Sequence, residues 1–128
     1  MRPGPARVLA EHEAAHAVVA RHFGFDVVSI AISEQRGFTE WRSTGAELWQ
    51  QAAVTAAGDL FNRECGSVPY INYGCGDLKR FEAEHGLARL WDANRAARSI
   101  LTQRRRAILL LADRIQRERY IRFEQAAA

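Results

Sequence analysis

The segment EHEAAHAVVA, residues 11–20, places two histidines and a glutamate inside an apolar run. Because an α-helix turns once in about 3.6 residues, His12 and His16 would project from one face, a turn apart. Two imidazoles at this spacing can bind one tetrahedral Zn²⁺ ion, and H-E-x-x-H on a helix is typical of zinc hydrolases. Glu13 would project at an angle to both rings, where it can act as a general base without being a ligand.

The alternative is a pair of surface histidines on an amphipathic helix. The neighbours of His12 and His16 are mostly alanine and valine, which favours a buried position. Titratable side chains are costly to bury without a partner, whereas neutral histidines bound to a metal ion are tolerated there. The apolar setting therefore favours metal ligands.

A catalytic zinc ion needs a third protein ligand and leaves its fourth position to water. His22 lies six residues after His16, which turns it away from the ligand face. His85 is another candidate, but we expect it to be an exposed residue at the end of a short helix. Asp77 is the stronger candidate, because it follows a glycine-rich loop that can approach the first helix and begins a helix that would hold it rigidly.

Helices can be predicted around these residues from the spacing of apolar side chains. A first helix is expected over 6–23, with Gly24 in the position of a helix-ending glycine. A second is expected over about 46–63, and its many alanines imply close packing against another helix. After a loop over 64–76, which holds three glycines and a proline, Asp77 stands at the head of a third helix, where an aspartate is most often simply an N-cap.

The last part of the chain reads as helical from Leu87 to about Phe123. It is either one long helix or two helices that meet between Thr102 and Arg106.

Two short segments between the first two helices are expected to be strands. VVSIAIS, residues 27–33, alternates and is rich in β-branched residues, and FTEWR, residues 38–42, can return as a second, shorter strand. We therefore predict a single, mainly α-helical domain over 1–128 with a small two-stranded β element. Residues 1–5 are expected to form a flexible lead-in and 124–128 a flexible tail.

The order of several segments resembles the peptidase domain of FtsH-type zinc metalloproteases. These segments are HEAAHAVVA, VVSIAIS, GFTEW, AAVTAAGDLF, GCGDLKR and the late ANRAARSILTQRRRAILLLADRI, so the resemblance extends from about Val8 to Ile121. It implies an FtsH-peptidase-like helical fold, Zn²⁺ as the cofactor and metalloendopeptidase activity. The aspartate of the family's Gly-Ala-x-x-Asp-Leu segment is its third zinc ligand, and that aspartate falls here on Asp77.

The sequence contains no GxxxxGK[ST] phosphate loop, so we expect a peptidase without an ATPase of its own. Its substrates would be peptides or unfolded protein, with Glu13 accepting a proton as water attacks the peptide bond. A substrate strand could pair with an exposed strand edge. The best candidate for that edge is Gly37, Phe38, Thr39, Glu40 and Trp41.

Two other functions fit the same residues. One is a catalytically silent, metal-binding peptidase-like module that acts through a protein partner. The other is a regulatory metallopeptidase that cuts a repressor. A separate ATPase or a regulator protein is a candidate partner, and an oligomer is compatible with the sequence.

Composition excludes several classes of protein. The formal net charge is +3, and 17 of the 18 cations are arginine, many of them in the late helical region. Acidic residues interrupt this region and no aromatic residues alternate with it, so we do not expect nucleic-acid binding. No apolar stretch reaches the roughly 18 residues of a membrane span, and MRPGPAR lacks an apolar signal-peptide core, so a cytoplasmic protein is expected. Cys65 and Cys75 are therefore expected to be free thiols.

Overall fold

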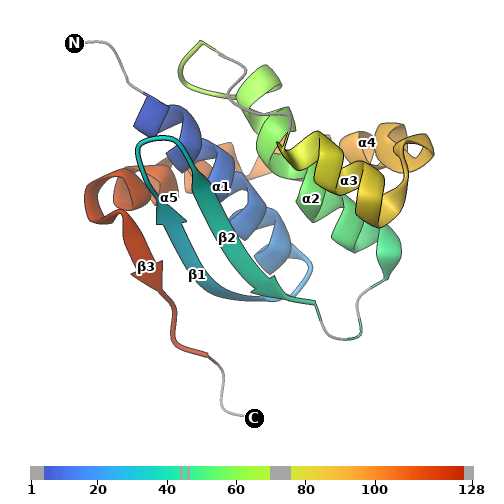
Figure 1. Cartoon of the computed structure of the whole chain (residues 1–128), viewed down its shortest axis with the longest axis horizontal. Helices are drawn as coiled ribbons and strands as arrows, with labels where there is room; N and C mark the ends of the chain where they lie inside the picture. The colour runs from blue at the N-terminus through green and yellow to red at the C-terminus, as the bar shows by residue number, and fades with distance from the viewer. Residues whose placement is uncertain (1–4, 44, 46, 70–75, 126–128) are drawn as a thin grey trace.

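The computed structural model describes residues 5–43, 45, 47–69 and 76–125. These residues form mainly helices, as predicted, together with a small antiparallel sheet (Figure 1). The elements in chain order are α1 (Pro5–His22), β1 (Asp26–Ile32), β2 (Gly37–Arg42), α2 (Leu48–Glu64), α3 (Gly76–His85), a 3₁₀ turn (Leu87–Arg89), α4 (Leu90–Gln103), α5 (Arg105–Glu118) and β3 (Tyr120–Arg122).

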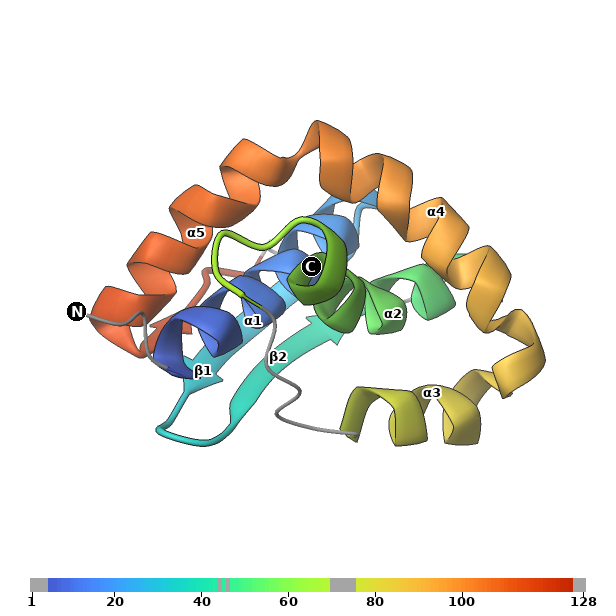
Figure 2. The same ribbon diagram turned by 90° about the horizontal axis from the view of Figure 1, so that it is seen from above.

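Helix α1 lies at the centre of the fold. The sheet packs against one side of it, and α2 and α5 pack against other sides (Figures 1 and 2). Small side chains make this possible, because they let neighbouring backbones approach from several directions. The fully buried alanines of α1 are Ala10, Ala14, Ala15, Ala17 and Ala20.

Helix α2 presents an equally small face to its neighbours α1 and α4. Its buried small residues are Ala52, Ala53, Ala56, Ala57 and Gly58. The predicted close packing of this helix is therefore confirmed. Helix α3 lies against α2 in turn, which brings the start of α3 to the same region as α1. It begins at Gly76, so Asp77 lies in its first turn and is not the N-cap that we predicted.

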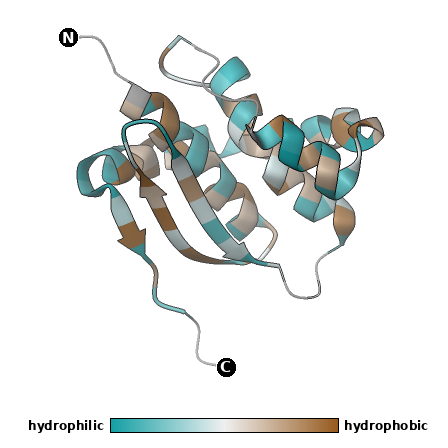
Figure 3. Cartoon of the chain, viewed as in Figure 1, coloured by the Kyte–Doolittle hydropathy of each residue, from teal (hydrophilic) through white to brown (hydrophobic). Residues whose placement is uncertain are grey.

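The sheet has three strands in the order β2-β1-β3, so the predicted two-stranded element was incomplete. Ile30 of β1 pairs with Thr39 on one side and with Ile121 on the other. Figure 3 shows β1 as mostly hydrophobic, in line with its central position. Beyond α5, Arg119 adopts a left-handed conformation with φ of 66°, which ends the helix and turns the chain into β3. The prediction of a helix up to Phe123 was therefore wrong.

The late helical region forms two helices, which meet at Arg104 (Figure 2). Each helix has its own buried stripe. The stripe of α4 is Ala93, Ala97, Ile100 and Leu101, and that of α5 is Ile108, Ala112 and Ile115. The change of direction between the helices lets both stripes face the core, which explains why one straight helix does not form.

Some predictions concern the ends and the central loop. Pro5 is the first residue of α1, so the predicted lead-in over 1–5 is at least one residue too long. The rest of that lead-in, the loop residues 70–75 with Cys75, and the last three residues of the tail lie outside the described residues. Cys65 carries a free thiol. Among the described segments, none of the helices has the length and apolar content needed to span a bilayer.

The close packing of α2 in the core can be tested by overpacking it. Ala53 has no solvent-exposed surface, and replacing it with leucine forces extra methylene groups into a closely packed contact. We expect Ala53→Leu to lower the free energy of unfolding by about 1–3 kcal/mol, measured by chemical denaturation. Ala107→Leu on the exposed side of α5 is the matched control and should change stability little. Equal stabilities of the two variants would contradict the close contact.

Candidate metal centre

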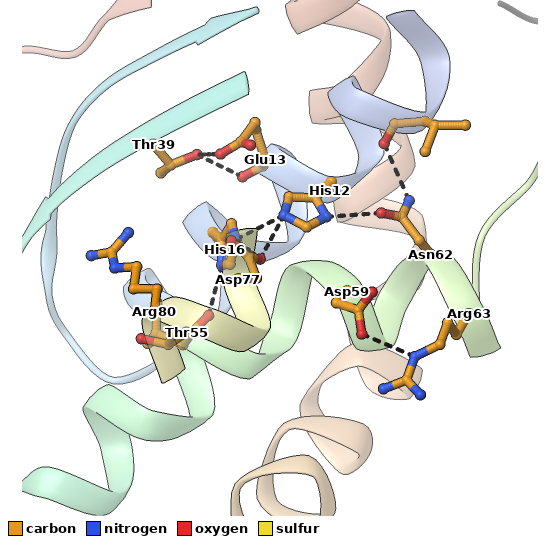
Figure 4. Close-up of polar contacts among 12 residues, drawn as sticks. His12, Glu13, His16, Thr39, Thr55, Asp59, Asn62, Arg63, Asp77 and Arg80 are labelled. Atoms are coloured by element: carbon orange, nitrogen blue, oxygen red, sulfur yellow. Dashed lines mark hydrogen bonds and ion pairs between the residues drawn. The ribbon is translucent and has the colours of Figure 1, made fainter. Parts of the chain in front are cut away.

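Three side chains from α1 and α3 converge on one point (Figure 4). His12 Nε2 lies 2.7 Å from Asp77 Oδ2, and His16 Nε2 lies 3.1 Å from the same oxygen. The two Nε2 atoms lie 3.2 Å apart. The structure thus brings together the three residues that the sequence predicts as ligands, and such a group could hold a metal ion.

The orientation of the His16 ring is set by α2. Its Nδ1 lies 2.7 Å from the backbone carbonyl oxygen of Val54, which can only accept a hydrogen bond. His16 Nδ1 must therefore carry a hydrogen and donate it. In the neutral ring this leaves the Nε2 lone pair directed at the point of convergence, as a metal ligand requires.

The same argument fixes the His12 ring through Asn62, also on α2. Asn62 Nδ2 donates to the backbone carbonyl oxygen of Val8 at 3.2 Å, which determines which way the amide faces. Asn62 Oδ1 then accepts from His12 Nδ1 at 2.8 Å. Both imidazoles therefore present Nε2 to the centre and are held from behind by hydrogen bonds.

The geometry fits a tetrahedral metal ion. With metal–ligand bonds of about 2.0–2.1 Å, ligand atoms in a tetrahedral site lie about 3.3 Å apart. Two of the three separations, 3.1 and 3.2 Å, match this value. The third, 2.7 Å between His12 and Asp77, is the length of a charge-assisted hydrogen bond. Two imidazole nitrogens and one carboxylate oxygen also form a donor set that Zn²⁺ uses.

Gly58 on α2 leaves the space that the ligand atoms need. A Cβ atom at this position would lie 2.5 Å from His16 Nε2 and 2.6 Å from His12 Nε2, closer than real Cβ contacts come. Any other residue would therefore press on both ligand atoms. Sequence reasoning missed Gly58 and Asn62, although a glycine and an asparagine inside an alanine-rich helix carry a propensity cost that could have pointed to them.

Interactions among the three candidate ligand side chains shift the pKa values of His12 and Asp77. Burial alone would lower the pKa of His12, but the hydrogen bond and charge of Asp77, with contributions from Glu13 and Asn62, raise it to about 9. Burial would raise the pKa of Asp77, but the charge of His16 and hydrogen bonds from both imidazoles hold it well below its usual range. The carboxylate is thus ionised and ready to bind a cation.

Glu13 lies next to His12, between α1 and β2 (Figure 4). Its carboxylate is buried, and its Oε1 accepts a hydrogen bond of 2.6 Å from the Thr39 hydroxyl. Gly37 packs so closely that a Cβ atom there would lie 2.5 Å from Glu13 Oε2. Strand β2 therefore holds the side chain that the sequence predicts as the general base.

The five residues predicted to bind substrate divide between the two faces of β2, since side chains alternate along a strand. Gly37 and Thr39 face Glu13, and Trp41 stacks on the His16 ring with centroids 5.8 Å apart. Phe38 and Glu40 are exposed, Phe38 to 53 %. Within the described residues β2 pairs with a strand on one side only, so its other edge is open to a further strand.

The two histidines that we set aside as ligands lie outside the cluster. His22 is exposed at the end of α1. His85 ends α3, as predicted, but its side chain is only 5 % exposed, so the prediction of an exposed residue was wrong. The chain turns at Gly86 and the imidazole packs against Phe81, with ring centroids 5.0 Å apart.

The sequence was compared with models of protein families and with curated proteins, and neither comparison gives a match.

The hydrogen bond between His12 and Asn62 can be tested with Asn62→Ala. Loss of the acceptor frees the ring to rotate, and such changes behind a ligand typically weaken metal binding by about 10- to 100-fold. We expect a loss of this size in the affinity for Zn²⁺, measured by competition with a fluorescent chelator. Asn94→Ala, at a half-buried residue of α4, is the control. An Asn62→Ala protein that is folded and binds Zn²⁺ as tightly as the control would contradict this role.

The raised pKa of His12 predicts a pH dependence. In the metal-free protein, a pKa of about 9 keeps the ring protonated at neutral pH, and a bound metal ion must displace that proton. The apparent affinity for Zn²⁺ should therefore fall as the pH is lowered from about 8.5 to about 7, by about tenfold per unit for one displaced proton. Chelator competition at several pH values measures this apparent affinity. An affinity that stays constant over this range would argue against a protonated His12.

Proposed function

We propose that this chain is a zinc-dependent metalloendopeptidase that hydrolyses peptide bonds in peptides or unfolded protein. The observation that carries the proposal is the convergence of His12, His16 and Asp77 beside Glu13. Three protein ligands leave the fourth position of a tetrahedral ion open, which distinguishes catalytic from structural zinc sites. The order of motifs that resembles FtsH-type peptidase domains supports the same function.

The chain's own residues can divide the work of hydrolysis. His12, His16 and Asp77 would hold Zn²⁺, which when bound lowers the pKa of a water molecule and polarises the scissile carbonyl group. Glu13 would accept the proton of the attacking water and pass it to the leaving amine. Because Thr39 occupies Glu13 Oε1, the proton would be carried on Oε2. Thr39 and Gly37 act as positioning residues that keep this carboxylate in one orientation.

The open edge of β2 supports an extended polypeptide as substrate. A strand added to this edge would form backbone hydrogen bonds while its side chains alternate between the two faces. Only chain segments with free backbone groups can bind in this way, which favours peptides and unfolded protein. Phe38 and Glu40, which are exposed, would contact such a strand, whereas Trp41 covers the His16 ring.

The proposal predicts that Glu13→Gln retains Zn²⁺ and loses cleavage. The amide cannot accept the proton, and general-base catalysis contributes about 10²- to 10⁴-fold. We expect the rate of cleavage of casein, an unstructured protein, to fall at least about 100-fold, with unchanged zinc content by metal analysis. Glu82→Gln, at an exposed carboxylate of α3, is the matched control.

Two outcomes would contradict the proposal. A Glu13→Gln protein that binds Zn²⁺ and cleaves as fast as the control excludes Glu13 as the base. A wild-type protein that binds Zn²⁺ but shows no Glu13-dependent cleavage of any peptide favours the metal-binding module that acts through a protein partner, such as a separate ATPase or a regulator.

A further inference from the structure

A groove of about 460 Å³ lies beside the metal centre, between β2, the first half of α2 and α3. It is lined by Thr39, which contacts Glu13, and by Trp41, which stacks on His16. Arg80, Glu84 and His85 of α3 also line it. Because a helix rises about 1.5 Å per residue, His85 lies about 12 Å along α3 from the ligand Asp77. The groove thus leads from the candidate active site to His85.

His85, which lines this groove, has an unmet capacity for hydrogen bonding. Its side chain is more than nine-tenths buried, and its Nε2 has no hydrogen-bond partner among the described residues. Glu84 Oε2 lies 3.7 Å away, which is beyond hydrogen-bond distance. Buried polar atoms without partners are rare in folded proteins, and each calls for an explanation.

The surroundings of His85 lower the pKa of its imidazole, which favours the neutral ring. Burial lowers its pKa, Arg89 and Arg80 act in the same direction, and Glu84 opposes them. A neutral imidazole presents Nε2 either as a donor or as an acceptor, depending on the tautomer. The matching group on a ligand is one that can both donate and accept.

The groups around His85 disfavour a charged ligand. An acidic side chain that reached Nε2 would lie close to the Glu84 carboxylate, and a basic one would meet Arg80 and Arg89. A carboxamide carries no charge and can both donate and accept hydrogen bonds. The glutamine side chain is also long enough to carry this group to a buried atom. Glu84, whose carboxylate lies 3.7 Å from Nε2, would have to move aside for such a side chain. Its ion pair with Arg80 is exposed at both ends, and such pairs are weak.

We propose that the His85 end of this groove is a subsite for a glutamine side chain of the bound polypeptide. The inference rests on the proposed peptidase function. An extended chain advances about 3.3 Å per residue, so a distance of about 12 Å places this glutamine three or four residues from the scissile bond. The apolar side chains of Phe38 and Leu48, which line the groove and are exposed, would cover the stem of the glutamine.

A set of unstructured peptides tests the subsite. Each peptide carries glutamine at one position from two to five residues on either side of the cleaved bond, and is compared with a peptide that has methionine there. Methionine has a similar length and cannot donate a hydrogen bond. For the wild type we expect kcat/KM to be about three- to tenfold higher with glutamine at one of these positions, the size expected for one hydrogen bond.

His85→Leu should remove this preference, because it fills the buried space without a polar atom. His22→Leu, at the exposed histidine of α1, is the matched control and should retain it. The subsite proposal is wrong if the wild type shows no preference for glutamine, or if His85→Leu shows the same preference as His22→Leu. Either result can occur while Glu13-dependent cleavage persists, so it leaves the proposed peptidase function standing.

A binding measurement separates this proposal from the catalytic one. In the uncleaving Glu13→Gln protein, the glutamine peptide should shift the NMR signal of the His85 imidazole nitrogens, and the methionine peptide should not. This result holds whether or not the chain is a peptidase. Equal shifts with both peptides, or none with either, would overturn the subsite.

Discussion

Both imidazoles of the candidate metal centre are held in place by α2, on the side opposite Asp77. His16 donates to the carbonyl oxygen of Val54 on that helix, and His12 donates to Asn62, about two turns further along it. These bonds form where α1 and α2 pack closely together, and many of the buried residues of both helices are alanine or glycine. The chemistry of the site thus depends on packing between small side chains. A helix with larger residues in these positions would hold the same histidines with their rings unsupported.

Some features of this arrangement are local in sequence and could be predicted. His12 and His16 share one helix, so their relation follows from helical geometry alone, and the position of Glu13 follows with them. Asp77 was predicted from a glycine-rich loop and from the resemblance to a known family, and it lies 61 residues from His16. Asn62 and Gly58 could not be predicted in the same way. Their roles come from a contact between two helices, and the pattern within one helix does not specify which of its residues meets which neighbour.

The three strands also differ in how well the sequence predicts them. The longer strands β1 and β2 have enough residues for alternation to be visible. The strand β3 has three, of which Ile121 is buried, and three residues are too few to distinguish a strand from the end of a helix. Thr39 shows a further limit of sequence reasoning. It was predicted to contact substrate because it lies on β2, and the structure adds a contact that the sequence did not predict, a hydrogen bond from its hydroxyl to the Glu13 carboxylate.

The distance along the chain between His16 and Asp77 has a further consequence. A metal ion held by both would join two helices 61 residues apart, as a covalent cross-link does. Closing a loop of this size restricts the unfolded chain and stabilises the folded state by about 4 kcal/mol in the loop-entropy treatment of disulfides. Loss of the ion would then do more than stop the proposed peptidase activity. It would loosen the attachment of α3 and shift the protein toward the unfolded state, so that inactive copies would be the ones most exposed to degradation.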